Sequence, residues 1–331
     1  MRLSNVCCQI IDLQNEGNRE GSPFEYHKEN EMKDLNQRQS VATEKEGQTA
    51  DIPATRKPVL PDRPVDAHKG TFGTALLLCG SYGMCGAEIL AAKAALRMGV
   101  GLVRAFVCRE NYAPFCVSVP EAVTLPVETS PQGGMVISSA QLAAALAGAK
   151  ALLIGCGLGR SAAAEQAVFS ALEQTEIPTV LDADGINAVA GNINLIRKVH
   201  APLIITPHPG EMARLCQCSI DKIEQNRVDF AQRFAVDNSC TVVLKGHRTV
   251  IALPNGQVLK NGTGCSGMAT GGSGDVLSGM LVSLLAQGMA PDRATEAAVW
   301  LHGYAGESAG QRLNERYLLP GDIIDELKNI L

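Results

Sequence analysis

The sequence predicts an α/β fold: a doubly wound, mostly parallel sheet with helices on both faces. Short, continuously apolar segments alternate with helical segments from Thr71 onward. Continuously apolar strands are typical of parallel sheets that are buried on both sides. Glycine-rich or charged turns follow many of these segments, and ligands bind at such turns in doubly wound sheets. The chain has 331 residues, of which 46% are hydrophobic, so it can bury a large core.

The individual elements are predicted from hydrophobic periodicity and turn residues. Buried strands are expected at residues 75–79, 102–107, 151–154, 179–182, 203–206 and 241–244. Helices are expected at residues 88–98, 162–172, 223–236, 276–286 and 294–307. Pro254-Asn255-Gly256 separates two further apolar segments, residues 249–253 and 258–260, and predicts a β-hairpin.

The N-terminal region has a different composition. Residues 1–66 contain 9 Lys or Arg and 12 Asp or Glu, whereas the remaining 265 residues contain 42 charged residues. No periodic apolar pattern persists there, and four prolines lie between positions 53 and 64. We therefore expect residues 1–55 to be a polar, disordered extension and residues 56–66 an extended lead-in. A single folded domain is expected over residues 56–331.

Charge and composition exclude several classes of protein. The net charge is −5, with one Trp and 4% aromatic residues, which argues against a nucleic-acid partner. No uninterrupted apolar run of about 18 residues is present, so no membrane span is expected. The first residues do not resemble a secretory signal. Eleven cysteines without a repeated spacing predict reduced thiols in a cytoplasmic protein. Cys216 and Cys218 form an isolated pair that predicts buried thiols more readily than a metal site.

Glycine-rich or charged turns follow five of the predicted strands, and parallel strands bring such turns to one edge of a sheet. The turns are Gly80 to Ala87, Gly155 to Gly159, Asp182 to Gly185, Thr206 to Glu211 and Lys245 to Thr249. Gly155 to Gly159 has the spacing GxGxG without a suitably placed acidic residue. A tight turn therefore explains this segment better than a dinucleotide cofactor site does.

The segment Asn261 to Gly279 carries the strongest signal. Its residues Gly271, Gly272, Ser273 and Gly274 precede a helix, so their backbone N–H groups and the helix dipole predict an anion hole suited to phosphate. Asp275 lies at the start of that helix. It is either an N-cap or a general base that takes a hydroxyl proton during phosphoryl transfer, and the preceding glycines favour the base.

Four other side chains have two interpretations each. His208 is either a satisfied turn histidine or a substrate contact. Glu211 either organises Mg²⁺ near phosphates or caps the next helix. Lys245 either neutralises phosphate or is a solvated charge. Asp182 and Asp184 either take part in acid–base or metal chemistry or only shape their turn.

These residues are where a family resemblance becomes specific. The Gly-Ser-Gly-Asp sequence ending at Asp275 resembles the ribokinase-like superfamily, and the chain is similar to one family within it, the ADP- or ATP-dependent NAD(P)H-hydrate dehydratases. The similar segments occur in the same order in the chain. They are residues 68–81, 86–103, 154–159, 181–188, 206–215, 243–252 and 267–279.

The resemblance implies a metabolite-repair reaction. The 6-hydroxyl group of the S epimer of hydrated NADH or NADPH (NADHX, NADPHX) is phosphorylated by ADP, or by ATP in some relatives. Loss of phosphate then restores the dinucleotide, because phosphate leaves far more easily than hydroxide. The resemblance implies Mg²⁺ as cofactor, with Glu211 as its organiser, and Asp275 as the base. It places the nucleotide on Lys245, Gly246, His247, Arg248, Thr249 and Gly274. It places the hydrated dinucleotide on Ala87, Gly157, His208 and Asp275.

The chain also departs from the family pattern. Cys265 stands where many relatives have Asn, which puts nucleotide affinity in doubt more than the chemistry. Many bacterial relatives carry an N-terminal epimerase domain, and the polar first 60-odd residues do not match one. We therefore expect a separate protein to supply the epimerase, and by resemblance a homotetramer.

Two other functions remain open at this point. The first is an ATP-dependent kinase of a vitamin alcohol or sugar on the same fold, which would use the same base and anion hole. The second is a nucleotide-sensing protein without catalysis, in which Cys265 marks lost activity. Neither the choice between ADP and ATP nor the preference between NADHX and NADPHX follows from the sequence.

Overall fold

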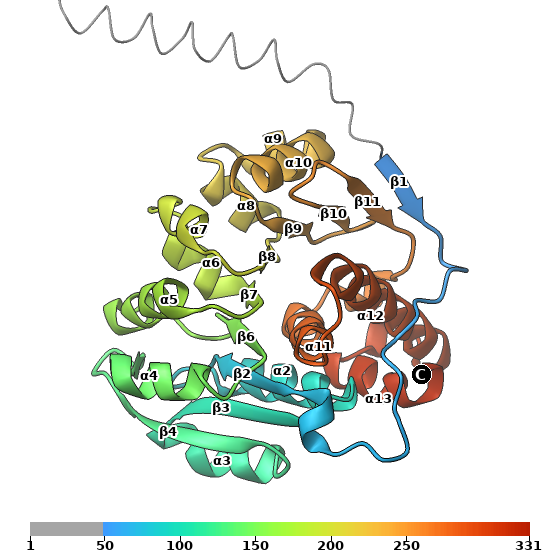
Figure 1. The fold of residues 1–331 in the computed structure, drawn as a ribbon. Helices are drawn as coiled ribbons and strands as arrows, with labels where there is room; N and C mark the ends of the chain where they lie inside the picture. The colour runs from blue at the N-terminus through green and yellow to red at the C-terminus, as the bar shows by residue number, and fades with distance from the viewer. Residues whose placement is uncertain (1–48) are drawn as a thin grey trace, which may run out of the picture. The chain divides into compact units, whose positions relative to one another are not determined.

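Eleven strands form one sheet in the computed structural model, which describes residues 49–331 (Figure 1). Their order across the sheet is β1-β11-β10-β9-β8-β7-β6-β2-β3-β4-β5. The strands are β1 (Thr49–Ile52), β2 (Thr74–Leu78), β3 (Leu102–Cys108), β4 (Val123–Thr129), β5 (Met135–Val136), β6 (Ala151–Ile154), β7 (Thr179–Leu181), β8 (Leu203–Ile205), β9 (Thr241–Leu244), β10 (Val250–Ala252) and β11 (Val258–Asn261). All pairings from β9 through β2 to β4 are parallel. The predicted fold class and hairpin are confirmed.

Helices cover both faces of this sheet. They are α2 (Cys85–Arg97), α3 (Tyr112–Ser118), α4 (Ser139–Leu146), α5 (Ala162–Gln174), α6 (Ala183–Val189), α7 (Asn194–Lys198), α8 (Pro209–Leu215), α9 (Ile220–Gln225), α10 (Arg227–Asp237), α11 (Ser273–Ala286), α12 (Pro291–Leu313) and α13 (Pro320–Ile330). Side chains alternate between two cores: Leu77 packs with α2, α11, α12 and α13, and Leu76 packs with α4, α5 and α8. Both faces of the sheet are covered by apolar cores, which explains why the strands are continuously apolar.

Helix α11 lies deepest of the helices that concern the site. Its residues from Val276 to Ala286 are all buried, and it packs between α2 and α12 (Figure 1). Gly279 has no room for a side chain against the backbone of Ala91 in α2, so this close packing requires glycine. This close packing against α2 and α12 fixes the position and direction of the N-terminus of α11.

Two regions differ from the sequence prediction. Residues 49–52, expected in the polar extension, form β1, which pairs in parallel with β11 and buries Ile52. The predicted helix over 223–236 is two helices, because the backbone at Asn226 is non-helical (φ −137°, ψ 43°). Residues 1–48, which hold most of the predicted extension, lie outside the described residues, and the domain boundary at 55 stays a prediction.

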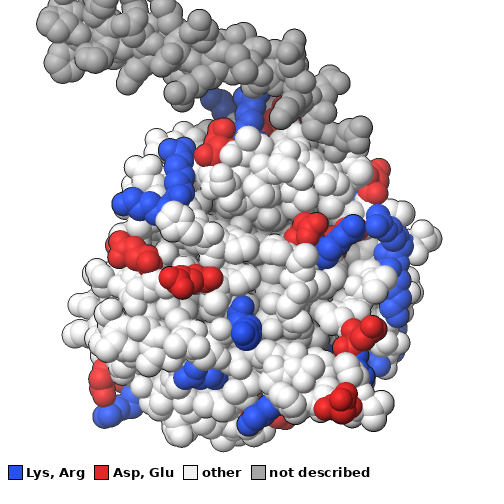
Figure 2. Space-filling view, viewed as in Figure 1, with Lys and Arg blue, Asp and Glu red and all other residues white. Residues whose placement is uncertain are grey.

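The surface shown in Figure 2 carries interspersed basic and acidic side chains with broad uncharged areas between them. Within residues 49–331, no helix combines the length and the apolar character that crossing a bilayer requires. The cysteines of this range form no disulfide, and Cys79, Cys108, Cys156 and Cys240 are buried.

Candidate active site

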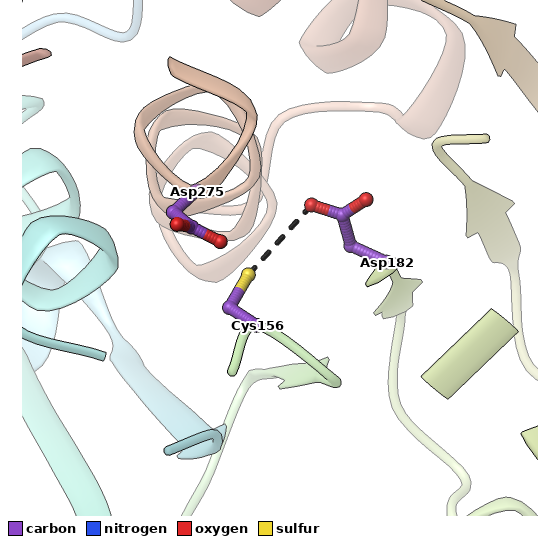
Figure 3. A group of neighbouring side chains, drawn as sticks. All are labelled: Cys156, Asp182 and Asp275. Atoms are coloured by element: carbon purple, nitrogen blue, oxygen red, sulfur yellow. Dashed lines mark hydrogen bonds between the residues drawn. The ribbon is translucent and has the colours of Figure 1, made fainter. Parts of the chain in front are cut away.

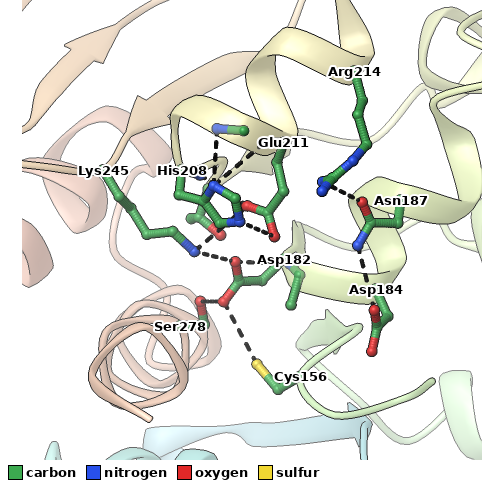
Figure 4. Close-up of polar contacts among 12 residues, drawn as sticks. Cys156, Asp182, Asp184, Asn187, His208, Glu211, Arg214, Lys245 and Ser278 are labelled. Atoms are coloured by element: carbon green, nitrogen blue, oxygen red, sulfur yellow. Dashed lines mark hydrogen bonds and ion pairs between the residues drawn. The ribbon is translucent and has the colours of Figure 1, made fainter. Parts of the chain in front are cut away.

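The carboxyl ends of four parallel strands bring the predicted polar residues together. Asp182 follows β7, His208 comes shortly after β8, Lys245 follows β9, and Cys156 comes two residues after β6. Helix α11 reaches the same place: its Ser278 contacts Asp182 (Figure 4), and its Asp275 lies near Asp182 and Cys156. This is the edge where doubly wound sheets bind ligands.

A buried ion pair lies at the centre of this group. The Nζ atom of Lys245 donates to Oδ1 of Asp182 over 2.6 Å, and the Asp182 side chain is 1% exposed. Burial alone would raise the pKa of Asp182, but Lys245 and the hydrogen bonds to the carboxylate hold this pKa below its usual value. Burial alone would lower the pKa of Lys245, and the facing carboxylates of Asp182 and Glu211 raise it. The interpretation of Lys245 as a solvated charge is therefore wrong.

His208 and Glu211 cap helix α8. Nδ1 of His208 accepts hydrogen bonds from the backbone N–H groups of Gly210 (3.0 Å) and Glu211 (3.3 Å). In return, Oε2 of Glu211 accepts from the backbone N–H of His208 (2.8 Å). The interpretation of Glu211 as a helix cap is confirmed, and the Nδ1 atom of His208 is satisfied within the turn. Both residues keep further roles open, since the same Glu211 oxygen lies 4.0 Å from Nζ of Lys245. Burial raises the pKa of Glu211, although Lys245 opposes this.

Asp275 lies in the first turn of α11 but does not cap it. The N-cap is Gly272, whose φ of 98° favours glycine, and no side chain caps this helix. The N-cap interpretation of Asp275 is therefore wrong. Burial, followed by the charge of Asp182, raises the pKa of Asp275 to about 6. A carboxyl group with that pKa is largely ionised at neutral pH and can still accept a proton.

One of the four residues predicted to form the anion hole, Ser273, already uses its backbone donor. The N–H of Ser273 donates to the carbonyl of Thr270 (3.3 Å), and its hydroxyl lies 3.3 Å from Nε2 of His302. Among residues 49–331, the backbone N–H groups of Gly274 and Asp275 meet no protein acceptor. A Cβ atom on Gly274 would lie 3.3 Å from Nζ of Lys245, so an anion approaching Gly274 also approaches that ammonium group.

A cavity of about 860 Å³ opens beside this turn, between the β9–β11 edge and helices α11 and α12. Its lining includes every residue predicted to bind the nucleotide, together with the anion-hole residues Gly271 and Ser273 and the substituted Cys265. These lining residues are Lys245, Gly246, His247, Arg248, Thr249, Cys265, Gly271, Ser273 and Gly274. His208 lines the near end of the cavity.

Ala87 and Gly157 meet at a different point of the same edge. A Cβ atom on Gly157 would lie 2.7 Å from Cβ of Ala87, so the backbone of Gly157 passes directly over the start of α2. The φ of Gly157 is 62°, and the hydroxyl of Ser81 donates to its carbonyl (2.9 Å). The structure thus brings together the two backbone positions predicted to contact the dinucleotide.

Three side chains of this region were missed at the sequence level. Arg227 in α10 holds the turn that begins at Lys245, donating to the carbonyls of Leu244, Lys245 and His247. Ser278 donates to Oδ2 of Asp182 (2.7 Å). His302 lines the cavity, and burial lowers its pKa to about 4. All three lie within helices, where the sequence pattern predicts packing and carries no signal for a site.

Carboxylates near the cavity fit a Mg²⁺ ion held mainly by nucleotide phosphates. Glu211 offers an oxygen ligand, which Mg²⁺ prefers, whereas both oxygens of Asp182 already accept hydrogen bonds from protein donors. A second group, Cys156, Asp182 and Asp275, has one ligand atom from each residue within 4.8 Å of the others (Figure 3). Its sulfur does not suit Mg²⁺.

Cys216 and Cys218 belong to no three-ligand group among residues 49–331, and burial raises the pKa of Cys216 to about 12.

Comparison with known proteins decides which family this site belongs to. The family model described as NAD(P)H-hydrate dehydratase matches residues 75–329. The chain belongs to the NAD(P)H-hydrate dehydratase family. The family identification made from the sequence is confirmed.

Relatives and solved structures agree with this family. An ADP-dependent (S)-NAD(P)H-hydrate dehydratase of Neisseria meningitidis is 40% identical over 75% of this chain and 82% of that protein. The ADP/ATP-dependent NAD(P)H-hydrate dehydratase of Bacillus subtilis, co-crystallised with ATP and Mg²⁺, is 32% identical, with a TM-score of 0.71 over 82% of this chain and 93% of that one. A ribokinase-like superfamily protein of Enterococcus faecalis is 28% identical, with a TM-score of 0.73 over 85% of this chain and 95% of that one. The fold is therefore ribokinase-like.

The chain spans about half the length of the bifunctional NAD(P)H-hydrate repair enzymes that it matches. The family is thus shown for the dehydratase part of those proteins. The individual roles of the site residues stay predictions in this NAD(P)H-hydrate dehydratase family member.

Proposed function

We propose that this chain dehydrates the S epimer of NADHX or NADPHX to NADH or NADPH, with ADP as phosphoryl donor and AMP and phosphate as products. One observation carries the proposal: Asp275 lies between the N-terminus of helix α11, which no side chain caps, and the Asp182–Lys245 ion pair. A cavity large enough for a nucleotide opens beside this group. The name of the Neisseria relative, an ADP-dependent (S)-NAD(P)H-hydrate dehydratase, supports ADP as the donor.

In this proposal Asp275 removes the proton from the 6-hydroxyl group while that oxygen attacks the β-phosphorus of ADP. AMP leaves, and the hydroxyl oxygen becomes part of a phosphate ester. Loss of phosphate from C6, with loss of a proton from the neighbouring ring carbon, then restores the double bond. The backbone N–H groups of Gly274 and Asp275, with Lys245, face the charge that develops on the transferred group.

The turn from Lys245 to Thr249 holds the nucleotide in this proposal, and Ala87, Gly157 and His208 hold the dinucleotide. The His208 ring acts as a neutral hydrogen-bond donor or acceptor in this proposal, because burial and the charges of Lys245 and Arg214 lower the pKa of the ring. Mg²⁺, held by the nucleotide phosphates with Glu211 as organiser, would neutralise phosphate charge. A homotetramer and a separately supplied epimerase remain predictions.

The deciding experiment is a coupled assay of the full chain with (6S)-hydrated NADH, Mg²⁺ and ADP, following reduced-nicotinamide absorbance. We expect turnover that requires nucleotide and falls by about 10²–10⁴-fold in Asp275→Asn, since the variant keeps the shape but cannot take a proton. Asp322→Asn is the matched control, because Asp322 occupies the same first-turn position of α13.

Absence of turnover with both ADP and ATP would overturn the proposal. A stable phosphorylated product from a vitamin or sugar alcohol would instead favour the kinase alternative. Nucleotide binding without any turnover would favour the sensing alternative.

A further inference from the structure

Cys156 is a buried thiol that the proposed reaction does not use. It lies two residues beyond the end of β6, is 0% exposed, and belongs to the core on the α2–α11 face of the sheet. Its neighbours Gly155 and Gly157 both have positive φ, so the turn is held in a conformation that directs residue 156 inward. A side chain at this position therefore points beneath the first turn of α11.

The thiol lies between two carboxylates (Figure 3). Its Sγ atom is 3.7 Å from Oδ2 of Asp182, and this atom, an Asp182 oxygen and an Asp275 oxygen all lie within 4.8 Å of one another. Asp182 comes from the end of β7 and Asp275 from α11, so Cys156 joins two elements that meet at the reaction centre.

The other donors around Asp182 are already assigned. Its Oδ1 atom accepts from Lys245 and from the backbone N–H of Ala183, and its Oδ2 atom accepts from Ser278. Asp275, by contrast, forms no ion pair with a basic side chain of residues 49–331. The thiol is the group placed to supply a proton between the two carboxylates.

The surroundings keep this proton on the sulfur. The groups facing Cys156 are Cys79 from β2, Asp182 from β7, Asp275 from α11 and, behind Asp182, Lys245 from β9. The hydrogen bond with Cys79, burial and the nearby carboxylates raise the pKa of Cys156 well above its usual value. A thiolate here would be a third negative charge, so the protonated donor is the stable form.

We propose that Cys156 is a positioning residue for the proposed reaction: its thiol proton bridges Asp182 and Asp275 and holds the Asp275 carboxylate ready to accept the substrate proton. The inference rests on the proposed function for its effect on turnover. The thiol contacts the base and not the reacting atoms, and no covalent step occurs at sulfur.

The thiol also affects how readily Asp275 ionises. Burial and Asp182 raise the pKa of Asp275, whereas the hydrogen bond from Cys156 and the charge of Lys245 lower it. Without the thiol, two carboxylates would face each other with less compensation. Loss of Cys156 should therefore make Asp275 harder to ionise.

The test compares Cys156→Ala, which removes the donor, with Cys156→Ser, which keeps a hydroxyl donor. In the assay with ADP and (6S)-hydrated NADH, we expect kcat/KM of wild type to fall below about pH 6 as Asp275 becomes protonated. Cys156→Ala should move this acidic limb upward by about half a pH unit or more, which corresponds to about threefold lower kcat/KM on the limb. Cys156→Ser should restore the wild-type limb.

The matched control is Cys240→Ala. Cys240 is equally buried, with a pKa raised to about 12 by burial alone, but it lies at the opposite end of the strands. This variant loses the same volume and should leave the acidic limb unchanged. An unshifted limb in Cys156→Ala, or a Ser variant that behaves like the Ala variant, would overturn the proposal.

A second readout does not depend on turnover. The carboxyl pKa of Asp275 can be titrated by ¹³C NMR of aspartate-labelled protein, with Asp275→Asn to assign the signal. We expect a higher pKa in Cys156→Ala than in wild type, and an equal value would overturn the proposal even if the wild type proves inactive. An inactive wild type with the expected pKa difference would contradict the proposed function alone. If Cys156→Ala does not fold, the Ser variant and wild type still test whether a donor at this site sets the pKa.

Discussion

Two fully buried carboxyl groups in this molecule have opposite environments. Asp182, at the end of β7, accepts hydrogen bonds from Lys245, Ser278, Cys156 and the backbone N–H of Ala183 (Figure 4). Glu88, in the first turn of α2, is 0% exposed, and neither of its side-chain oxygens has a hydrogen-bond partner. Its carboxyl group lies against the backbone of Gly80.

The difference shows that donors, and not burial, decide the charge of such a group. Burial raises the pKa of both carboxyls, but at Asp182 the lysine and hydrogen bonds outweigh it, so this pKa is lowered. At Glu88 the nearby Cys79 adds to the effect of burial, and its pKa is raised well above the usual value. Asp182 is therefore an ionised part of the site, and Glu88 a neutral acid in the core.

The largest expected effect is at Asp182. Asp182→Ala should lower the free energy of unfolding by about 3–5 kcal/mol, because it leaves a largely buried lysine and three further donors without this acceptor. Urea unfolding of the variant and wild type measures this change. Asp184→Ala is a control two residues further along the chain, where the ion-pair partner Arg160 is exposed. A loss below about 1 kcal/mol at Asp182 would show that the pair is not a stabilising centre.

The second prediction concerns how stability varies with pH. A folded-state pKa above the unfolded value means that the folded protein binds the extra proton, so Glu88 contributes stability at low pH that is lost as pH rises. Glu88→Gln should remove a slope of about 1.4 kcal/mol per pH unit that begins above pH 4.5 and ends at the raised folded-state pKa, and thus stabilise the protein increasingly as pH rises through that window. Asp182 has the opposite sign: its lowered pKa gives stability that is lost as pH falls.

Urea unfolding at several pH values measures both slopes. Glu173→Gln, at an exposed position of α5, serves as the control for a change of formal charge. Parallel curves for wild type and Glu88→Gln would mean that Glu88 is not buried as a neutral acid.

The smallest expected effect is at one donor of Asp182. Ser278→Ala should lower the free energy of unfolding by about 1.5–3 kcal/mol, the range for a hydrogen bond to a charged group, and should raise the pKa of Asp182. Ser283→Ala, also buried in α11, removes hydrogen bonds to neutral partners only and should cost less. Equal losses at the two serines, measured by thermal unfolding, would contradict the special role of the Asp182 carboxylate.

Much of the site follows from local sequence. Asp275 and the glycines before it indicate a helix that begins with an open N-terminus. Pro209 and Glu211, next to His208, indicate a helix with a capped N-terminus. Both features are local, so the printed sequence contains their full signal. The strands can also be predicted from local sequence, because a parallel strand that is buried on both faces consists almost entirely of apolar residues.

Other features were missed because their cause is distant in the chain. Strand β1 carries a polar sequence and exists because the edge of β11 offers it hydrogen-bond partners. Arg227 was missed because its partners are the carbonyls of a turn that begins at position 245. Such contacts with the backbone of a distant segment cannot be predicted from a pattern of residue types.

The sequence by itself determined the α/β class, the order of the elements, the family, and the presence of a phosphate-type turn before Asp275. Only the tertiary structure decided which side chains meet. Lys245 and Asp182 are 63 residues apart and Ser278 and Asp182 are 96 apart, yet all three join in one buried network. The physical reason is that long-range packing sets the order of strands across the sheet, and this order determines which side chains become neighbours. The same packing leaves the Glu88 carboxyl group without a hydrogen-bond partner among residues 49–331.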